Sequence, residues 1–253
     1  MSAPIQQIND PRIHALAGTM GGLTSTLVTY PLISLSTRLQ TNSQSKHSLY
    51  AGIESALFGI SITNFIYYYV YEGLQLTALL RSTAAGAVTS VSTNPIWVIN
   101  ARLTNKKMSF MDCMTEINNE GIMSLFKGVL PSLILVSNPV IQYTLYDRWI
   151  KKTDKSYKMI FLVAAITKLI ATFITYPYLV IKSRQQVDKG HTSIKDHAKN
   201  VYEELGLYGF YKGVLWKCVQ TVINSSFLFL FKEFYVDIAR ILLYGKDIKK
   251  KVE

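Results

Sequence analysis

The feature that most constrains this chain is a proline-centred pattern that occurs three times. The three copies read YPLISLSTRLQ at 30–40, NPIWVINARLT at 94–104 and YPYLVIKSRQQ at 176–186. In each copy Tyr or Asn precedes the proline, and an arginine follows it by seven residues, in the pairs Pro31/Arg38, Pro95/Arg102 and Pro177/Arg184. A proline inside an apolar helix removes a backbone donor and kinks the helix. The pattern therefore predicts a threefold internal repeat with a helix kinked at Pro31, Pro95 and Pro177.

A second element follows each proline, in which an aromatic residue, a variable residue and a glycine close a short segment before the next apolar run. It reads YAG at 50–52, FKG at 126–128 and YKG at 211–213, so the first copy has Ala51 where the others have lysine. In the second and third repeats a Ser-x-x-Asp helix cap, at 109–112 and 193–196, opens the segment before it. The segment from proline to closing glycine spans 21 residues in the first repeat, against 33 and 36 in the others. We therefore expect only two surface helices, at about 110–119 and 194–205, and none between Gln40 and Tyr50.

Composition points to a membrane protein. Hydrophobic residues make up 49% of the 253 residues, charged residues only 17%, and the mean hydropathy is +0.19. Apolar runs long enough to span a bilayer lie at about 15–35, 52–71, 79–99, 129–149, 159–181 and 214–235. We expect an all-α membrane protein of six transmembrane helices in a single domain over 1–253, with repeats at about 11–76, 77–155 and 156–245.

The net charge of +11 fits loops that contact anionic lipid headgroups, or a positive cavity for an anionic solute. The basic residues are dispersed between apolar runs, which argues against nucleic-acid binding. Cys113 and Cys218 lie in different repeats without metal-ligand spacing, and no catalytic motif occurs. We therefore expect no cofactor, no metal site and no enzymatic activity.

The three repeats, each with a proline signature, a surface helix and an aromatic-basic-glycine closure, resemble the mitochondrial carrier family. Within it the chain is most similar to the peroxisomal adenine-nucleotide carriers, over stretches such as TYPLISLSTRLQT, LFKGVLPSLILVSNPVIQYTLYD and TYPYLVIKSRQQV. The resemblance implies a pseudo-threefold carrier with one central site and alternating access. It also implies a monomer, placed in the peroxisomal membrane by that organelle's insertion machinery, with the link 151–158 as part of the targeting information. The alternative location is the mitochondrial inner membrane.

The signatures depart from the family pattern, which has an acid two residues and a base five residues after the proline. The acidic positions hold Ile33, Trp97 and Leu179, and the basic positions hold Ser36, Asn100 and Lys182. The usual ion-pair ring cannot form from these residues. We expect this mouth to close by packing and hydrogen bonds instead.

Charged side chains inside membrane spans are costly and usually face a water-filled cavity. The residues expected to bind phosphates are Arg102, Lys182, Arg184 and Lys217, with Lys168 as a further candidate. For the arginines, the alternative is that they extend to lipid headgroups. Residues placed by the resemblance at the level of the solute are Gly59, Leu135, Val136 and Gln220, and Asn138 and Asn224 could donate to a base or ribose or bond a neighbouring helix.

The even-numbered spans end in three acids, Glu72, Asp147 and Glu233, which form a possible gate at the other mouth. The family pairs such acids with a base three residues later, but those positions hold Gln75, Ile150 and Val236 here. Lys151, Lys155 or Lys232 could substitute.

The function that follows from the resemblance is exchange of adenine nucleotides, ATP for AMP or ADP, across the peroxisomal membrane. The alternatives are a carrier of CoA, FAD or NAD and, from a different class, a membrane scaffold that does not transport.

Overall fold

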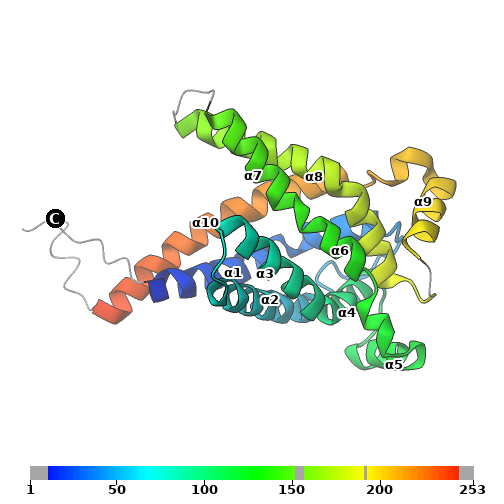
Figure 1. The fold of residues 1–253 in the computed structure, drawn as a ribbon. Coiled ribbons are helices and arrows are strands. Elements are labelled where there is room, and N and C mark those ends of the chain that lie inside the picture. The colour runs from blue at the N-terminus through cyan, green and yellow to red at the C-terminus, as the bar shows by residue number, and fades with distance from the viewer. Residues whose placement is uncertain (1–10, 152–156, 191–192, 245–253) are drawn as a thin grey trace, which may run out of the picture. The chain divides into compact units, whose positions relative to one another are not determined.

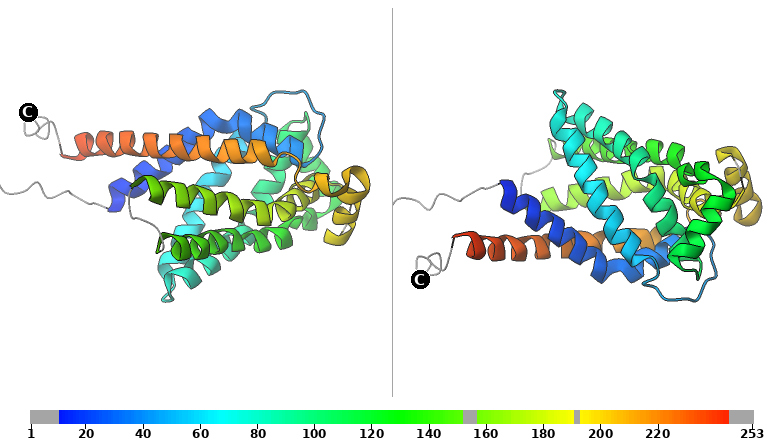
Figure 2. Two further views of the ribbon diagram at one scale, coloured as in Figure 1. Left: turned by 90° about the horizontal axis from the view of Figure 1, so that it is seen from above. Right: turned by 90° about the horizontal axis from the view of Figure 1, so that it is seen from below.

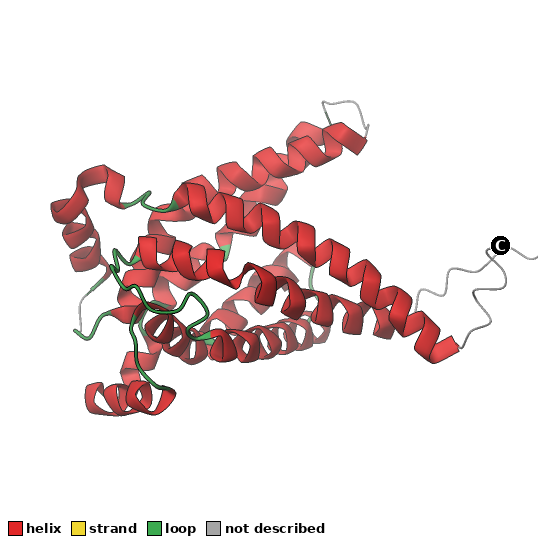
Figure 3. Ribbon diagram, turned by 180° about the vertical axis from the view of Figure 1, so that it is seen from behind, coloured by secondary structure: helices red, strands yellow, loops and turns green. Residues whose placement is uncertain are grey.

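The computed structural model describes residues 11–151, 157–190 and 193–244, and these form helices and connecting turns without a strand (Figures 1 and 3). The helices are α1 (Pro11–Gln40), α2 (Ile53–Gly73), α3 (Ala78–Ser92), α4 (Asn94–Asn105), α5 (Phe110–Glu120), η1 (Ile122–Phe126), α6 (Val129–Leu135), α7 (Ser137–Ile150), α8 (Tyr157–Val187), α9 (Ile194–Gly209) and α10 (Val214–Tyr244). The all-α expectation is confirmed for these residues.

Two of the expected spans are divided into shorter helices. The third is broken at Thr93 between α3 and α4, so Pro95 lies in the first turn of a new helix. The fourth is divided at Val136, four residues after Ser132 and three before Pro139. Both divisions lie just before a proline, which lacks the N–H needed to continue the hydrogen-bond ladder. α1 and α8, by contrast, continue through Pro31 and Pro177.

Two described segments, Ile122–Ile150 and Leu162–Val187, are long and apolar enough to cross a membrane by length and composition. Each has a mean hydropathy of 1.5, and only 22% and 33% of their apolar windows are buried inside the protein. Their outward-facing apolar side chains are typical of helices that face lipid.

The chain divides into two compact units, residues 1–29 with 219–253, and residues 30–218. In the first unit, the start of α1 packs along the end of α10. Ala17 and Val236 are buried there, and the hydroxyls of Thr24 and Tyr235 are 2.9 Å apart. A Cβ at Gly22 would lie 3.6 Å from Leu228, an ordinary van der Waals contact, so the two helices lie side by side here without requiring glycine.

The second unit contains all three signatures and shows their threefold relation through the closing glycines. Gly52, Gly128 and Gly213 begin α2, α6 and α10 with φ values of +80°, +79° and +83°, a conformation that favours glycine. Each also packs against the helix that carries the proline signature of the next repeat, namely α4, α8 and α1 in turn. A Cβ at Gly52 would lie 3.2 Å from Leu103, one at Gly128 3.1 Å from Gln186, and one at Gly213 2.9 Å from Leu39. The contacts run from repeat one to two, two to three, and three to one.

The surface helices agree with the sequence. α5 and α9 begin with complete capping boxes from Ser109/Asp112 and Ser193/Asp196. Cys113 and Ile117 of α5 are buried against Leu103, and Val201 of α9 is buried against Val180. The segment 41–52 contains turns but no helix, as the short first repeat predicts. α5 and α9 lie at the same end of the second unit, beside the ends of α4 and α8 (Figure 2).

Candidate functional site

The residue before each signature proline anchors the closing turn of its own repeat. Tyr30 donates to the carbonyl of Ala51 at 3.0 Å, Asn94 to that of Lys127 at 2.9 Å, and Tyr176 to that of Lys212 at 3.0 Å. All three acceptors directly precede the closing glycine. A side chain with a terminal hydrogen-bond donor is therefore needed at this position, and both tyrosine and asparagine provide one.

The signature arginines connect each repeat to the next. Arg38 Nε donates to the carbonyl of Thr104 at 3.0 Å, Arg102 Nε to that of Gln186 at 3.3 Å, and Arg184 Nε to that of Gln40 at 3.4 Å. The acceptors are equivalent residues, each nine positions after its own proline. These bonds form a closed ring from repeat one to two to three and back to one.

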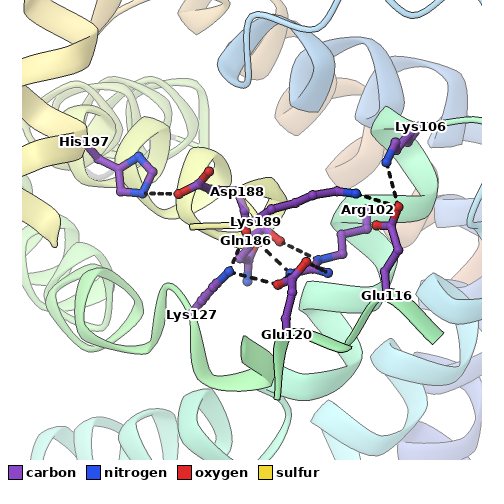
Figure 4. Close-up of polar contacts among 9 residues, drawn as sticks. All are labelled: Arg102, Lys106, Glu116, Glu120, Lys127, Gln186, Asp188, Lys189 and His197. Atoms are coloured by element: carbon purple, nitrogen blue, oxygen red, sulfur yellow. Dashed lines mark hydrogen bonds and ion pairs between the residues drawn. The ribbon is translucent and has the colours of Figure 1, made fainter. Parts of the chain in front are cut away.

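The rest of each guanidinium binds the segment that follows its own signature helix. Arg102 makes a bidentate ion pair with Glu120 at the end of α5, with N–O distances of 2.9 and 2.7 Å (Figure 4). Lys127 Nζ also donates to Glu120 at 3.0 Å. Arg184 pairs with Glu204 of α9 at 2.8 Å. Burial acts to raise the pKa of the Glu120 carboxyl, but the hydrogen bonds from Arg102 and Lys127 outweigh it and hold the pKa below its ordinary value.

Arg38 has no surface helix in its repeat and binds backbone carbonyls of the segment 41–52 instead. Its guanidinium donates to Ser45 at 3.2 Å, His47 at 2.9 Å and Ser48 at 2.6 Å. The carbonyls of the short segment thus take the place that a glutamate occupies in the other two repeats.

We expect Arg38→Lys to destabilise the protein, because an ammonium cannot hold four divergent carbonyls as a guanidinium does. The loss should be about 1–3 kcal/mol, measured by thermal unfolding of purified protein in detergent. Lys46→Ala removes a positive charge from an exposed position in the same segment and should leave the unfolding temperature unchanged. Equal effects of the two substitutions would contradict this role for Arg38.

Two signature positions that lack charge, Trp97 and Asn100, make hydrogen bonds and packing contacts with the first repeat. Asn100 donates to Gly52 O at 2.8 Å and to the hydroxyls of Tyr30 and Ser55 at 3.1 Å. Trp97 Nε1 donates to Thr63 at 3.3 Å, and its ring lies against Gly59. Gly59, expected at the level of the solute, is buried here against Trp97 and Ile96.

Three lysines from α8 and α10 form a cationic cluster on otherwise apolar helices. Lys217 in the first turn of α10 interacts electrostatically with both Lys168 and Lys182 of α8. Lys168 donates to Asn138 Oδ1 at 3.0 Å, and Asn138 in turn donates to Thr175 at 2.8 Å. Among the described residues, no carboxylate lies within ion-pair distance of Lys168 or Lys182. Like charges gathered in an apolar setting favour a bound anion.

The other expected solute contacts are dispersed. Val136 packs against Gly86 of α3, and Leu135 ends α6 half-buried. Gln220 and Asn224 belong to the other unit, where Gln220 is buried and Asn224 accepts hydrogen bonds from Ser25 and Thr29. Asn224 therefore bonds a neighbouring helix, which is the second of the two roles that the sequence left open for it.

Of the three gate acids, Asp147 has a described partner. Lys151 Nζ lies 2.6 Å from its carboxylate, one turn further along the same chain segment, and both side chains are exposed. The role of the three acids as a gate stays a prediction. The side chains of Glu72 and Glu233, and residues 152–156 of the lysine-rich link, lie outside the described part of the structure.

Sequence reasoning did not identify Glu120 and Glu204 as partners of the signature arginines. Each lies within two residues of a glycine, Gly121 or Gly206, whose φ of +91° or +61° turns the chain at that point. A glutamate one or two residues before a glycine, between the proline signature and the aromatic-lysine-glycine element, is the sequence pattern that could have identified these partners. Arg102 and Arg184 are buried and pair with these carboxylates, so each guanidinium already has an anionic partner.

Comparison with known proteins supports the same architecture. The model of the mitochondrial carrier protein family matches residues 75–158 and 153–240. The chain is 32% identical to mitochondrial substrate carrier family protein Q of Dictyostelium discoideum, over 94% of this chain and 92% of that protein. It is 31% identical to the peroxisomal nicotinamide adenine dinucleotide carrier of Arabidopsis thaliana, over 93% and 98% of the two chains. It is 28% identical to peroxisomal adenine nucleotide carrier 1 of Glycine max, over 87% and 89%. With three linked signatures and these matches along its length, the chain belongs to the mitochondrial carrier family, whose members are multi-pass membrane transporters.

Proposed function

We propose that this chain is a carrier of the peroxisomal membrane that exchanges adenine nucleotides, ATP for AMP or ADP, by alternating access. The observation that carries the proposal is the cluster of Lys168, Lys182 and Lys217. Lys168 and Lys182 are 14 residues apart, about 21 Å along a helix of 1.5 Å rise per residue, and Lys217 interacts with both. A row of cations of this length suits an elongated polyanion such as a nucleotide with several phosphates.

The peroxisomal location is supported by the relatives, which include the peroxisomal carriers of Arabidopsis thaliana and Glycine max. We propose that insertion machinery of that organelle places the protein, which acts as a monomer in the bilayer.

The second candidate solute is a dinucleotide. The Arabidopsis thaliana relative is a nicotinamide adenine dinucleotide carrier and is 31% identical, slightly more than the Glycine max adenine nucleotide carrier at 28%. The cationic row suits the pyrophosphate of NAD as well, and CoA and FAD carry the same group. Only transport measurements distinguish these solutes.

The test is exchange by purified protein in liposomes loaded with ATP and supplied outside with labelled ATP, AMP, NAD or CoA. We expect exchange of ATP with ATP and AMP, at least tenfold faster than with NAD or CoA. Exchange of NAD or CoA alone would overturn the adenine-nucleotide proposal and leave the carrier function. No exchange of any solute, by protein that unfolds cooperatively in detergent, would favour the scaffold.

A further inference from the structure

An ion pair joins the second and third repeats at the signature end of the second unit, which is the end where α1, α4 and α8 terminate at Gln40, Asn105 and Val187. Lys189, just after α8, places its Nζ 2.9 Å from Oε1 of Glu116 on α5 (Figure 4). Lys106, after α4, binds the same oxygen at 2.7 Å. The hydrogen bonds from Lys106 and Lys189 lower the pKa of the Glu116 carboxyl, so it stays ionised at neutral pH.

The neighbouring contacts strengthen the same boundary. Arg102 and Lys127 of the second repeat both donate to the carbonyl of Asp188, at 3.5 and 2.6 Å. Asp188 and Lys189 are adjacent and directly follow α8. Three charged side chains of the second repeat therefore bind this short segment, namely Arg102, Lys127 and Glu116.

The other two boundaries are joined differently. From the first repeat, Arg38 donates to Thr104 O and Ser43 to Asn105 O at 3.2 Å. From the third, Arg184 donates to Gln40 O and Ser183 to Gln40 Oε1 at 2.8 Å. In the part of the chain that the structure describes, Glu116–Lys189 is therefore the ion pair between repeats at this end.

The pair is accessible to water. The side chains of Lys106 and Lys189 are 53% and 59% exposed, and they line a cavity of about 230 Å³ together with Thr41, Asn105 and Val187, which lie at or just beyond the ends of the three signature helices. An exposed ion pair is weak and screened by salt, so it can break and re-form.

We propose that Glu116 and Lys189 form a reversible electrostatic latch that holds the second and third repeats together when the signature end is closed. It supplies at one boundary the ion pairing that the signatures lack at Ile33, Trp97 and Leu179. The latch would act in the transport cycle of the proposed function, but its test does not depend on transport.

The test measures how often the signature end opens. Gln185 lies in the last turn of α8 and is 8% exposed, and its Oε1 has no hydrogen-bond partner among the described residues. Gln185→Cys therefore places a buried thiol at this end of the signature helix without breaking a hydrogen bond to that oxygen. Cys113 and Cys218 are first replaced by alanine, since they are the only other cysteines in the sequence. The alkylation rate of the thiol is then measured in detergent at low and high salt.

We expect Glu116→Gln to accelerate alkylation about two- to fivefold at low salt, the range for a partly exposed ion pair. High salt should accelerate alkylation of the parent protein by a similar factor. It should leave the alkylation rate of the Glu116→Gln variant unchanged, because screening and substitution remove the same interaction. Glu116→Lys should accelerate alkylation further than Glu116→Gln does. The double variant Glu116→Lys/Lys189→Glu should restore slow alkylation.

The matched control is Glu203→Gln, which removes an exposed carboxylate paired with Lys199 within α9 at 3.7 Å. It should leave the alkylation rate and its salt dependence unchanged. The latch is overturned if the thiol is alkylated at the same rate in Glu116→Gln as in the parent at low salt. It is also overturned if the double variant Glu116→Lys/Lys189→Glu is alkylated as fast as Glu116→Lys. A carrier that transports no nucleotide would refute the proposed function but not these rates.

Discussion

Glu120→Ala is expected to lower the free energy of unfolding by about 3–5 kcal/mol, because it leaves a buried guanidinium without its carboxylate. Arg102 is 3% exposed, and both of its terminal nitrogens bond Glu120. Lys127 loses its carboxylate in the same variant. Thermal and denaturant unfolding of purified protein in detergent would measure the loss.

The equivalent substitution in the third repeat provides the comparison. Glu204 pairs with Arg184 but is 48% exposed, against 13% for Glu120, so water screens the interaction. Glu204→Ala should cost no more than about 1 kcal/mol. Replacing both partners in Glu120→Ala/Arg102→Met should recover part of the stability, since no buried charge is then left. Equal losses for Glu120→Ala and Glu204→Ala would contradict the dependence on burial.

The pH dependence of the Glu120 contribution has a definite sign. Its folded-state pKa is depressed, so the unfolded state binds the proton more tightly. The stability that Glu120 contributes is therefore fully present at neutral pH and is lost only on acidification, as the pH falls through the depressed pKa. In Glu120→Ala this part of the acid sensitivity should be absent.

Lys217→Gln is expected to weaken nucleotide affinity about ten- to a hundredfold, the effect of losing one charge-assisted phosphate contact of about 1.5–3 kcal/mol. The loss should be larger for ATP than for AMP, because the triphosphate carries more charge to neutralise. Competition of each nucleotide with labelled ATP uptake into liposomes would give the apparent affinities. Lys182→Gln should behave in the same way, since its charge interacts with that of Lys217.

Lys199→Gln is the control for charge alone, because Lys199 is 73% exposed on the surface helix α9. It should not change the affinity for either nucleotide. Small, equal losses for ATP, AMP, NAD and CoA in Lys217→Gln would show that this lysine does not contact phosphate.

The sequence by itself determined the repeat, the helical class and the local ends of helices. These depend on neighbours along the chain: a proline that interrupts backbone bonding, a Ser-x-x-Asp cap, and a glycine that adopts a positive φ at Gly52, Gly128 and Gly213. The missing surface helix was predictable for the same reason, since the first repeat lacks the residues to form it.

The partners of the charged residues were decided only by the tertiary structure. Arg102 lies eighteen residues from Glu120 and 84 from Gln186, and several acceptors were equally compatible with the sequence. That Arg102 and Arg184 bind phosphate stays a prediction, and the structure adds that each buried guanidinium pairs with a carboxylate of a surface helix, Glu120 or Glu204. Lys168 and Lys182 share α8 with Arg184, but no described carboxylate lies within ion-pair distance of them. Which of these cations pairs with an acid of the surface helices is set by the packing of the repeats, not by the order of residues along the chain.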